Sequence, residues 1–125
     1  MAVAEANGIE SDLLPKIATG FCSGMARTGG ICGALNGGIM SLGLLEGRRE
    51  PGESVDEVYA KVQILIEKFE AKFGALTCRE LTGVHLGTPE GQAEFREKNQ
   101  IENCLNYAEE TTRIVLDLVD KKADS

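Results

Sequence analysis

The order of apolar and polar residues along the chain predicts helices. No stretch alternates apolar and polar residues as a half-buried strand would. Between residues 55 and 73 the apolar positions recur every three or four residues, as on one face of an α-helix. These positions are Val55, Val58, Tyr59, Val62, Leu65, Ile66, Phe69 and Phe73. Ser54 and Glu57 form a capping-box pattern at the start, and Gly74 is suited to end the helix. We therefore expect a helix over residues 54–73.

The C-terminal part predicts a second long helix, over residues 94–121. Its apolar stripe consists of Ile101, Cys104, Leu105, Ala108, Thr112, Val115 and Val119. The pair Thr88–Pro89 just upstream is typical of a helix start, because proline fits the first turn. Between the two long helices, Thr77 and Glu80 repeat the capping-box pattern and predict a short helix that Gly83 ends.

The N-terminal part predicts two more helices, over residues 11–26 and 28–46, separated by a break at residues 27–30. Together these elements indicate an all-α, antiparallel bundle of about four main helices plus a short one. A chain of 125 residues builds a single core, so we expect one domain over residues 1–125. Residues 121–125 are expected to form a disordered tail.

The charge balance argues against polyanionic partners, which bind to positively charged protein surfaces. Thirteen Lys and Arg against twenty Asp and Glu give a net charge of −7, which argues against nucleic-acid binding. The longest uncharged stretch, residues 28–45, holds six glycines, so we expect a helix buried in protein and no membrane insertion. The N-terminus does not have the pattern of a secretory signal, which predicts a cytoplasmic protein.

Glycines are concentrated where the pattern otherwise predicts helix. Nine of the fifteen lie between Gly20 and Gly47, and each costs a helix about 0.5–1 kcal/mol relative to alanine. The spacing of Gly29, Gly33 and Gly37 would expose backbone along one helix face. This pattern is explained either by close packing of helices or by the approach of a ligand, such as a cofactor, or of a second subunit. The second explanation predicts a homo-oligomer.

Four cysteines, Cys22, Cys32, Cys78 and Cys104, are the candidates for chemistry. They are separated by 10, 26 and 46 residues, so no local C-x-x-C motif is present. Cys78 is predicted to begin a capped helix beside Arg79, which would lower its pKa. Cys32 is predicted to lie in a first helical turn and feel the same field more weakly. Cys22 and Cys104 are expected to be neutral and inert unless a metal or a partner sulfur is near.

Several segments together resemble one known family. They are Gly20-Phe-Cys-Ser-Gly-Met-Ala-Arg27, Cys32-Gly-Ala-Leu-Asn-Gly37, Met40-Ser-Leu-Gly-Leu44 and Phe73-Gly-Ala-Leu-Thr-Cys-Arg-Glu-Leu81, followed by Cys104. Over nearly the whole chain this pattern resembles the C_GCAxxG_C_C family of small, helical, four-cysteine proteins, whose redox role was proposed from their cysteines. The resemblance matches Cys32, Cys78 and Cys104 to the last three family cysteines. For the first, either Cys22 takes its place or the chain lacks it because its N-terminal helix is shorter.

Two functions of different classes follow. In the first, the thiols are redox-active or bind metal: Cys32 or Cys78 attacks a disulfide that a redox partner protein presents, or Cys32, Cys78 and Cys104, with or without Cys22, hold zinc or an iron–sulfur cluster. In the second, the chain is a non-catalytic helical module whose Gly-rich face mediates dimer packing or docks a partner. Triad hydrolysis has no support, because His85 is the single histidine.

Overall fold

The computed structural model describes the backbone of residues 2–123 and the side chains of residues 2–119. Within this range the fold is all-α, as predicted, and its one β-type contact is an isolated bridge. The helices are α1 (Ala2–Ala6), α2 (Leu13–Ala18), the 3-10 turn η1 (Thr19–Phe21), α3 (Cys22–Arg27), α4 (Gly33–Glu46), α5 (Asp56–Phe73), α6 (Cys78–Thr82), α7 (Pro89–Glu97) and α8 (Ile101–Ala123).

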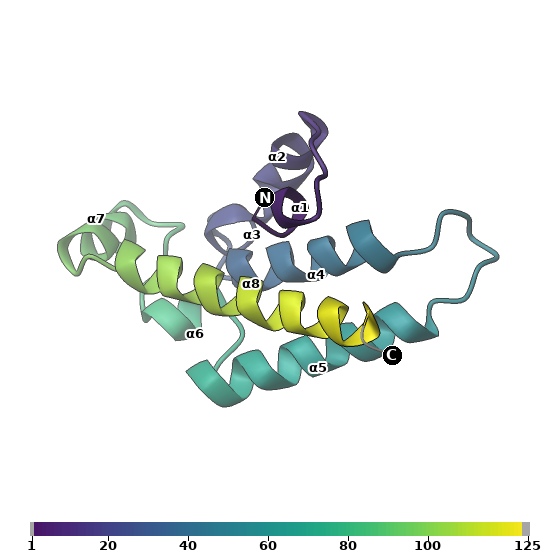
Figure 1. Ribbon diagram of the computed structural model, residues 1–125. Coiled ribbons are helices and arrows are strands. Elements are labelled where there is room, and N and C mark those ends of the chain that lie inside the picture. The colour runs from purple at the N-terminus through teal and green to yellow at the C-terminus, as the bar shows by residue number, and fades with distance from the viewer. Residues whose placement is uncertain (1, 124–125) are drawn as a thin grey trace.

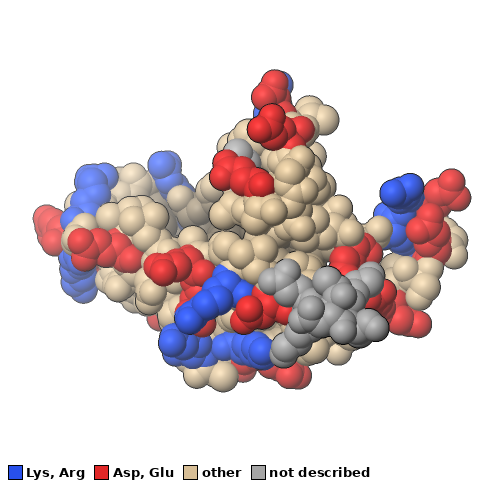
Figure 2. Space-filling model, in the orientation of Figure 1, with Lys and Arg blue, Asp and Glu red and all other residues tan. Residues whose placement is uncertain are grey.

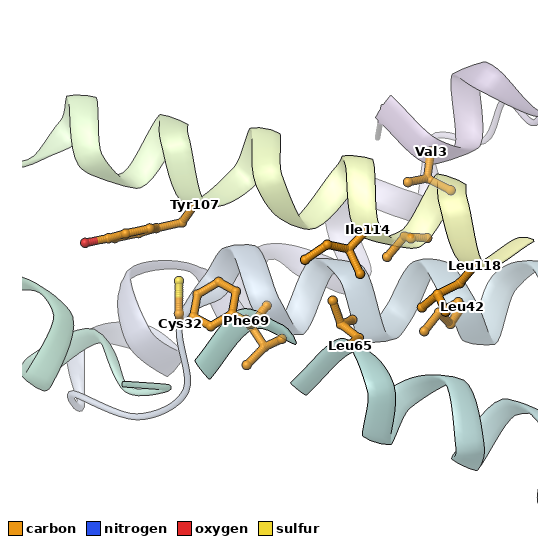
Figure 3. Packing of buried hydrophobic residues seen from close by; sticks show 10 residues of the cluster. Val3, Cys32, Leu42, Leu65, Phe69, Tyr107, Ile114 and Leu118 are labelled. Carbon is orange, nitrogen blue, oxygen red and sulfur yellow. The ribbon is translucent and has the colours of Figure 1, made fainter. Parts of the chain in front are cut away.

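Three long helices, α4, α5 and α8, pack against one another and form the core of the bundle. Figure 1 shows α5 running antiparallel to both α4 and α8, with α1 and α2 stacked on one side and α6 and α7 at one end. Leu42, Leu65 and Val115 each contribute a fully buried side chain to the centre. At one end of this core, Phe69 packs beside Cys32 and contacts the ring of Tyr107 (Figure 3).

Helix α5 confirms the predicted helix over most of its length. Its end at Gly74 is as expected, because Gly74 adopts a left-handed conformation with a φ of 82°. The predicted capping box is wrong: the helix begins at Asp56, and the Ser54 hydroxyl accepts a hydrogen bond from the Asp56 N–H instead. The short helix α6 does form as predicted, with the Thr77 side chain accepting from the Glu80 N–H and Gly83 ending the helix.

The predicted helix over residues 94–121 is divided in two. Asn99 has a φ of 51°, and this left-handed residue separates α7 from α8. The predicted buried stripe of α8 is also partly wrong, because Ile101 and Leu105 are 52% and 64% exposed. The face that packs on α4 and α5 includes Tyr107, Thr111, Ile114, Val115 and Leu118. Both faces have helical spacing, so periodicity alone could not distinguish them. Helix α8 continues to Ala123, and the remainder of the expected tail lies outside the described residues.

The predicted helix over residues 11–26 is broken into α2, η1 and α3. Every residue from Ser23 to Arg27 has a positive φ, between 54° and 69°, so α3 is a left-handed turn. Such a turn costs about 1–2 kcal/mol for each residue other than glycine. The break before α4 is confirmed but is longer than expected, since α4 begins at Gly33 and ends at Glu46.

Close helix packing explains one of the glycines of α4. A Cβ atom on Gly38 would lie 2.4 Å from Cγ2 of Thr111 and 3.0 Å from Cδ2 of Leu65, so Gly38 allows α4 to approach α8 and α5. A Cβ atom on the neighbouring Gly37 would meet nothing within 4 Å. The two glycines therefore have different roles although they are adjacent.

This difference predicts opposite effects of alanine at the two positions. Gly38→Ala is expected to lower the free energy of unfolding by about 1–3 kcal/mol because it overpacks the core. Gly37→Ala is expected to raise it by about 0.5–1 kcal/mol, since alanine favours the helix. Urea denaturation of the two variants and the parent protein measures both changes. Equal effects at the two positions would contradict this account of the packing.

Candidate functional site

Four cysteines from four separate segments line one cavity. Cys22 belongs to α3, Cys32 precedes α4, Cys78 begins α6, and Cys104 lies in the second turn of α8. The cavity has a volume of about 400 Å³. All four are free thiols. Folding therefore gathers side chains that are up to 82 residues apart in sequence, from Cys22 to Cys104.

A short antiparallel contact between two chain segments holds Cys32 and Cys78 in place. Ile31 and Thr77 form the isolated β-bridge, which two backbone hydrogen bonds flank. The Cys32 N–H donates to the Leu76 carbonyl at 2.8 Å, and the Cys78 N–H donates to the Gly30 carbonyl at 2.8 Å. The two cysteines thus share the backbone contact that joins the start of α4 to the start of α6.

The register of this bridge makes Cys32 and Cys78 diagonal neighbours. Each follows a bridge residue and stands where its segment leads into a helix. Diagonal neighbours in an antiparallel pair have Cα atoms about 7–8 Å apart. A disulfide needs Cα atoms about 4.4–6.8 Å apart. A small approach of the two segments would therefore let these sulfurs bond.

The left-handed turn of α3 packs directly on Cys78. A Cβ atom on Gly24 would lie 2.4 Å from the Cβ and 3.1 Å from the Sγ of Cys78, and the φ of Gly24 is +66°. Only glycine fits this contact without a shift of the neighbours. Two contacts support the turn: the Gly30 N–H donates to the Gly24 carbonyl, and the Thr28 hydroxyl approaches the carbonyls of Gly24 and Met25.

Burial and neighbouring thiols determine the electrostatics of the site. Burial raises the pKa of Cys78, as does the charge of Cys32, and a hydrogen bond from Thr82 only partly offsets these effects. Burial also raises the pKa of Cys104, with further contributions from Cys32 and Cys78. A charge acts in this way at short range, which agrees with the position of these thiols around one cavity.

The predicted low pKa of Cys78 is therefore wrong. Cys78 does occupy the first position of a capped helix, but α6 has five residues and a correspondingly small macrodipole. Cys78 is 8% exposed, and the loss of solvation outweighs the helix field. Sequence reasoning could locate the helix start but could not show that it was buried.

The other three thiols also differ from their predicted settings. Cys22 was expected to be buried in a helix, but it is exposed and begins the left-handed turn. Cys104 is half-buried and faces the cavity, together with Ile101 and Ala108 of the stripe that was expected to pack in the core. Cys32 is 7% exposed and is the N-cap residue of α4 rather than part of its first turn.

The three glycines expected to approach a ligand are dispersed. Gly29 precedes α4, so it does not share a helix face with Gly33 and Gly37. Gly33 lines the cysteine cavity, whereas Gly37 lines two other cavities, between α4 and the N-terminal helices and between α4, α1 and α8. Of the three, Gly33 alone belongs to the site.

Other cavity residues were not singled out from the sequence. They are Ser23, Arg27, Ala34, Leu86, Gln92, Phe95 and Arg96, besides glycines and the residues of α8. The sequence pattern predicts one long helix from residue 94, so it does not indicate that the residues of α7 face a site. Among the described residues, no group of three or more His, Cys, Asp or Glu side chains is arranged to hold a metal ion. In the same part of the chain, no helix is both long and apolar enough to cross a membrane.

A comparison with known families adds one finding about the whole chain. Residues 1–118 match the family described as "Putative redox-active protein (C_GCAxxG_C_C)". The chain therefore belongs to the C_GCAxxG_C_C family, a class defined by its cysteines and glycines. No curated protein and no solved structure matches the chain.

The burial of the thiols predicts their order of reaction in the native protein. Iodoacetamide is expected to modify Cys22 first, because it is exposed. The rate at Cys78 should rise with pH through a midpoint above the ordinary thiol pKa of about 8.5, because burial favours the neutral form. Mass spectrometry of peptides from timed reactions gives each rate, and the protein unfolded in urea is the control. A midpoint at or below 8.5 for Cys78 would show that burial does not govern its pKa.

Proposed function

We propose that this protein is a thiol–disulfide exchange protein in which Cys32 and Cys78 are the reacting pair. The observation that supports this most directly is the convergence of four free thiols from distant segments on one cavity. Thiols that served only packing would have no reason to share a cavity. The chain's family has a redox description that was itself proposed from the cysteines, so it agrees with this proposal without adding separate evidence.

The electrostatics of the pair favour Cys32 as the attacking residue. The charge of Cys32 is among the causes that raise the pKa of both Cys78 and Cys104. A negative charge on Cys32 therefore disfavours ionisation of the other two thiols. Cys32 is also the N-cap residue of α4, a helix of fourteen residues, and its side chain forms no capping hydrogen bond. The sulfur is thus not engaged at the helix start, and the residue lines the cavity.

The exchange then proceeds in two steps. The Cys32 thiolate attacks one sulfur of a substrate disulfide, and the substrate's second sulfur leaves as a thiolate. Forming this mixed disulfide removes the charge of Cys32, which is one of the causes of the raised pKa of Cys78. Cys78 can then lose its proton, attack Cys32 and release the remaining half of the substrate. The protein loses two electrons and two protons in total, and the substrate disulfide gains them.

Thiol counting and cysteine variants test this mechanism. After treatment with hydroxyethyl disulfide, the pair is expected to account for two lost thiols, and digestion should yield a peptide pair joined through Cys32 and Cys78. Exposed Cys22 is expected to add a mixed disulfide of its own. Cys32→Ser should slow the first step by at least about tenfold, since the attacking thiolate is gone. Cys78→Ser should stop the reaction at the mixed disulfide. Cys22→Ser is the matched control, because Cys22 lines the same cavity but is outside the pair.

Three results would contradict the proposal. A Cys32→Ser variant that reacts as fast as the parent would exclude Cys32 as the attacking residue. Stoichiometric zinc or iron in protein purified without oxygen would favour the metal-thiolate alternative. Unreactive thiols together with loss of self-association in a Gly33→Leu variant would favour the helical interaction module. Circular dichroism of each variant verifies that it folds.

A further inference from the structure

The lining of the cysteine cavity differs in charge from the rest of the chain. The sequence has 20 acidic residues and 13 Lys and Arg. Within the part that the structure describes, however, the cavity lining includes no Asp, Glu, Lys or His, and its charged members are Arg27 and Arg96. Figure 2 shows acidic side chains in patches across the visible face, with Lys and Arg in separate groups at the left over α7, below the centre and at the right. The cavity is thus a positive site on an acidic protein.

Neither guanidinium group at the cavity has an ion-pair partner among the described residues. Arg27 comes from α3 and Arg96 from the last turn of α7, and both are exposed. A guanidinium presents several N–H groups in a planar arrangement that matches a carboxylate. Two such groups at one cavity are suited to a ligand that carries more than one carboxylate.

The arginines and the sulfurs lie at different depths. Cys32 and Cys78 are buried, whereas Arg27 and Arg96 are exposed. The other lining side chains are largely apolar and include Leu86, Phe95 and Ile101. A ligand that fits this arrangement has a sulfur that reaches inward and anionic groups that stay at the opening.

The size of the cavity indicates a small molecule. Its volume of about 400 Å³ is within the range of roughly 300–1,000 Å³ for small-molecule sites. The net charge of −7 argues against an acidic protein partner, because two acidic surfaces repel each other. A small anion instead feels mainly the charges within a Debye length, about 8–10 Å.

We infer that the cavity binds low-molecular-weight thiols that carry carboxylates, in the form of their disulfides, and that Arg27 and Arg96 hold the carboxylates. This inference rests on the proposed thiol–disulfide exchange. The Cys32 thiolate attacks one sulfur of the bound disulfide, one half stays as the mixed disulfide with its carboxylates on the arginines, and the other half leaves as a thiolate. Cys78 then attacks Cys32 and releases the first half as a second thiolate. One substrate disulfide is therefore reduced by two electrons for each disulfide formed in the protein.

Three small disulfides of different charge test the inference. They are oxidised glutathione, which is anionic, hydroxyethyl disulfide, which is neutral, and cystamine, which is cationic. The rate of mixed-disulfide formation at Cys32 is measured by intact mass in a Cys22→Ser, Cys78→Ser background, because exposed Cys22 would otherwise react as well. The rate with oxidised glutathione is divided by the rate with hydroxyethyl disulfide to give a ratio. A ratio cancels any general change in the reactivity of Cys32. We expect Arg27→Gln and Arg96→Gln each to lower it about two- to threefold, and both together about three- to tenfold.

Two controls accompany these variants. Arg49→Gln makes the same charge change in the α4–α5 connection, at the other end of the molecule from α7 (Figure 1), and should leave the ratio unchanged. Arg96→Lys keeps the charge but not the planar group, so it should lower the ratio less than Arg96→Gln does. In the parent protein, about 0.5 M salt should lower the ratio, because it screens the arginines.

The outcomes separate this inference from the proposed function. A ratio that is unchanged in the double variant would overturn the inference, even if hydroxyethyl disulfide still reacts at Cys32 as the proposed function requires. A parent protein that prefers cystamine to oxidised glutathione would also overturn it, because the overall charge would then outweigh the two arginines. Failure of all three disulfides to react with Cys32 would refute the proposed function and this inference with it.

Discussion

The arrangement of the site depends on one pair of backbone hydrogen bonds. The bonds from Cys32 to Leu76 and from Cys78 to Gly30 join two short segments that each lead into a helix. Without this contact, the starts of α4 and α6 would not be joined, and the distance between the two thiols would not be fixed. A buried N–H or carbonyl that loses its partner costs about 1–3 kcal/mol, so the contact is stable once water is excluded from it. The remaining features of the cavity are built around this join.

Local signals in the sequence predicted the fold class and several helix ends. Gly74, Gly83 and Thr88–Pro89 act through their own backbone preferences, and each ends or starts a helix where expected. The site was predictable only as a set of cysteines. Their grouping depends on the contact between residues 30–32 and 76–78. A contact between segments so far apart in sequence produces no periodic pattern from which it could be predicted. The error at Cys78 has the same origin, because the helix start is a local property whereas burial is a property of the whole fold.

The turn at α3 shows how this fold tolerates an unfavourable backbone. Ser23, Met25 and Ala26 adopt conformations that side chains normally avoid. This turn brings Gly24 into close contact with Cys78. Strained backbone of this kind is common at functional sites, where the surrounding structure imposes it. The glycine-rich sequence was predicted to be helical, and the reversed hand of this turn is the main departure from that prediction.

The position of Cys32 and Cys78 in the chain links their oxidation to the stability of the bundle. A bond between them would close a ring of 47 residues that includes α4 and α5. Closing such a ring restricts the unfolded chain and typically stabilises a fold by about 2–4 kcal/mol. By thermodynamic reciprocity, the folded bundle would stabilise that bond against reduction by the same amount. Resistance to unfolding and resistance to reducing agents would then rise and fall together in this molecule.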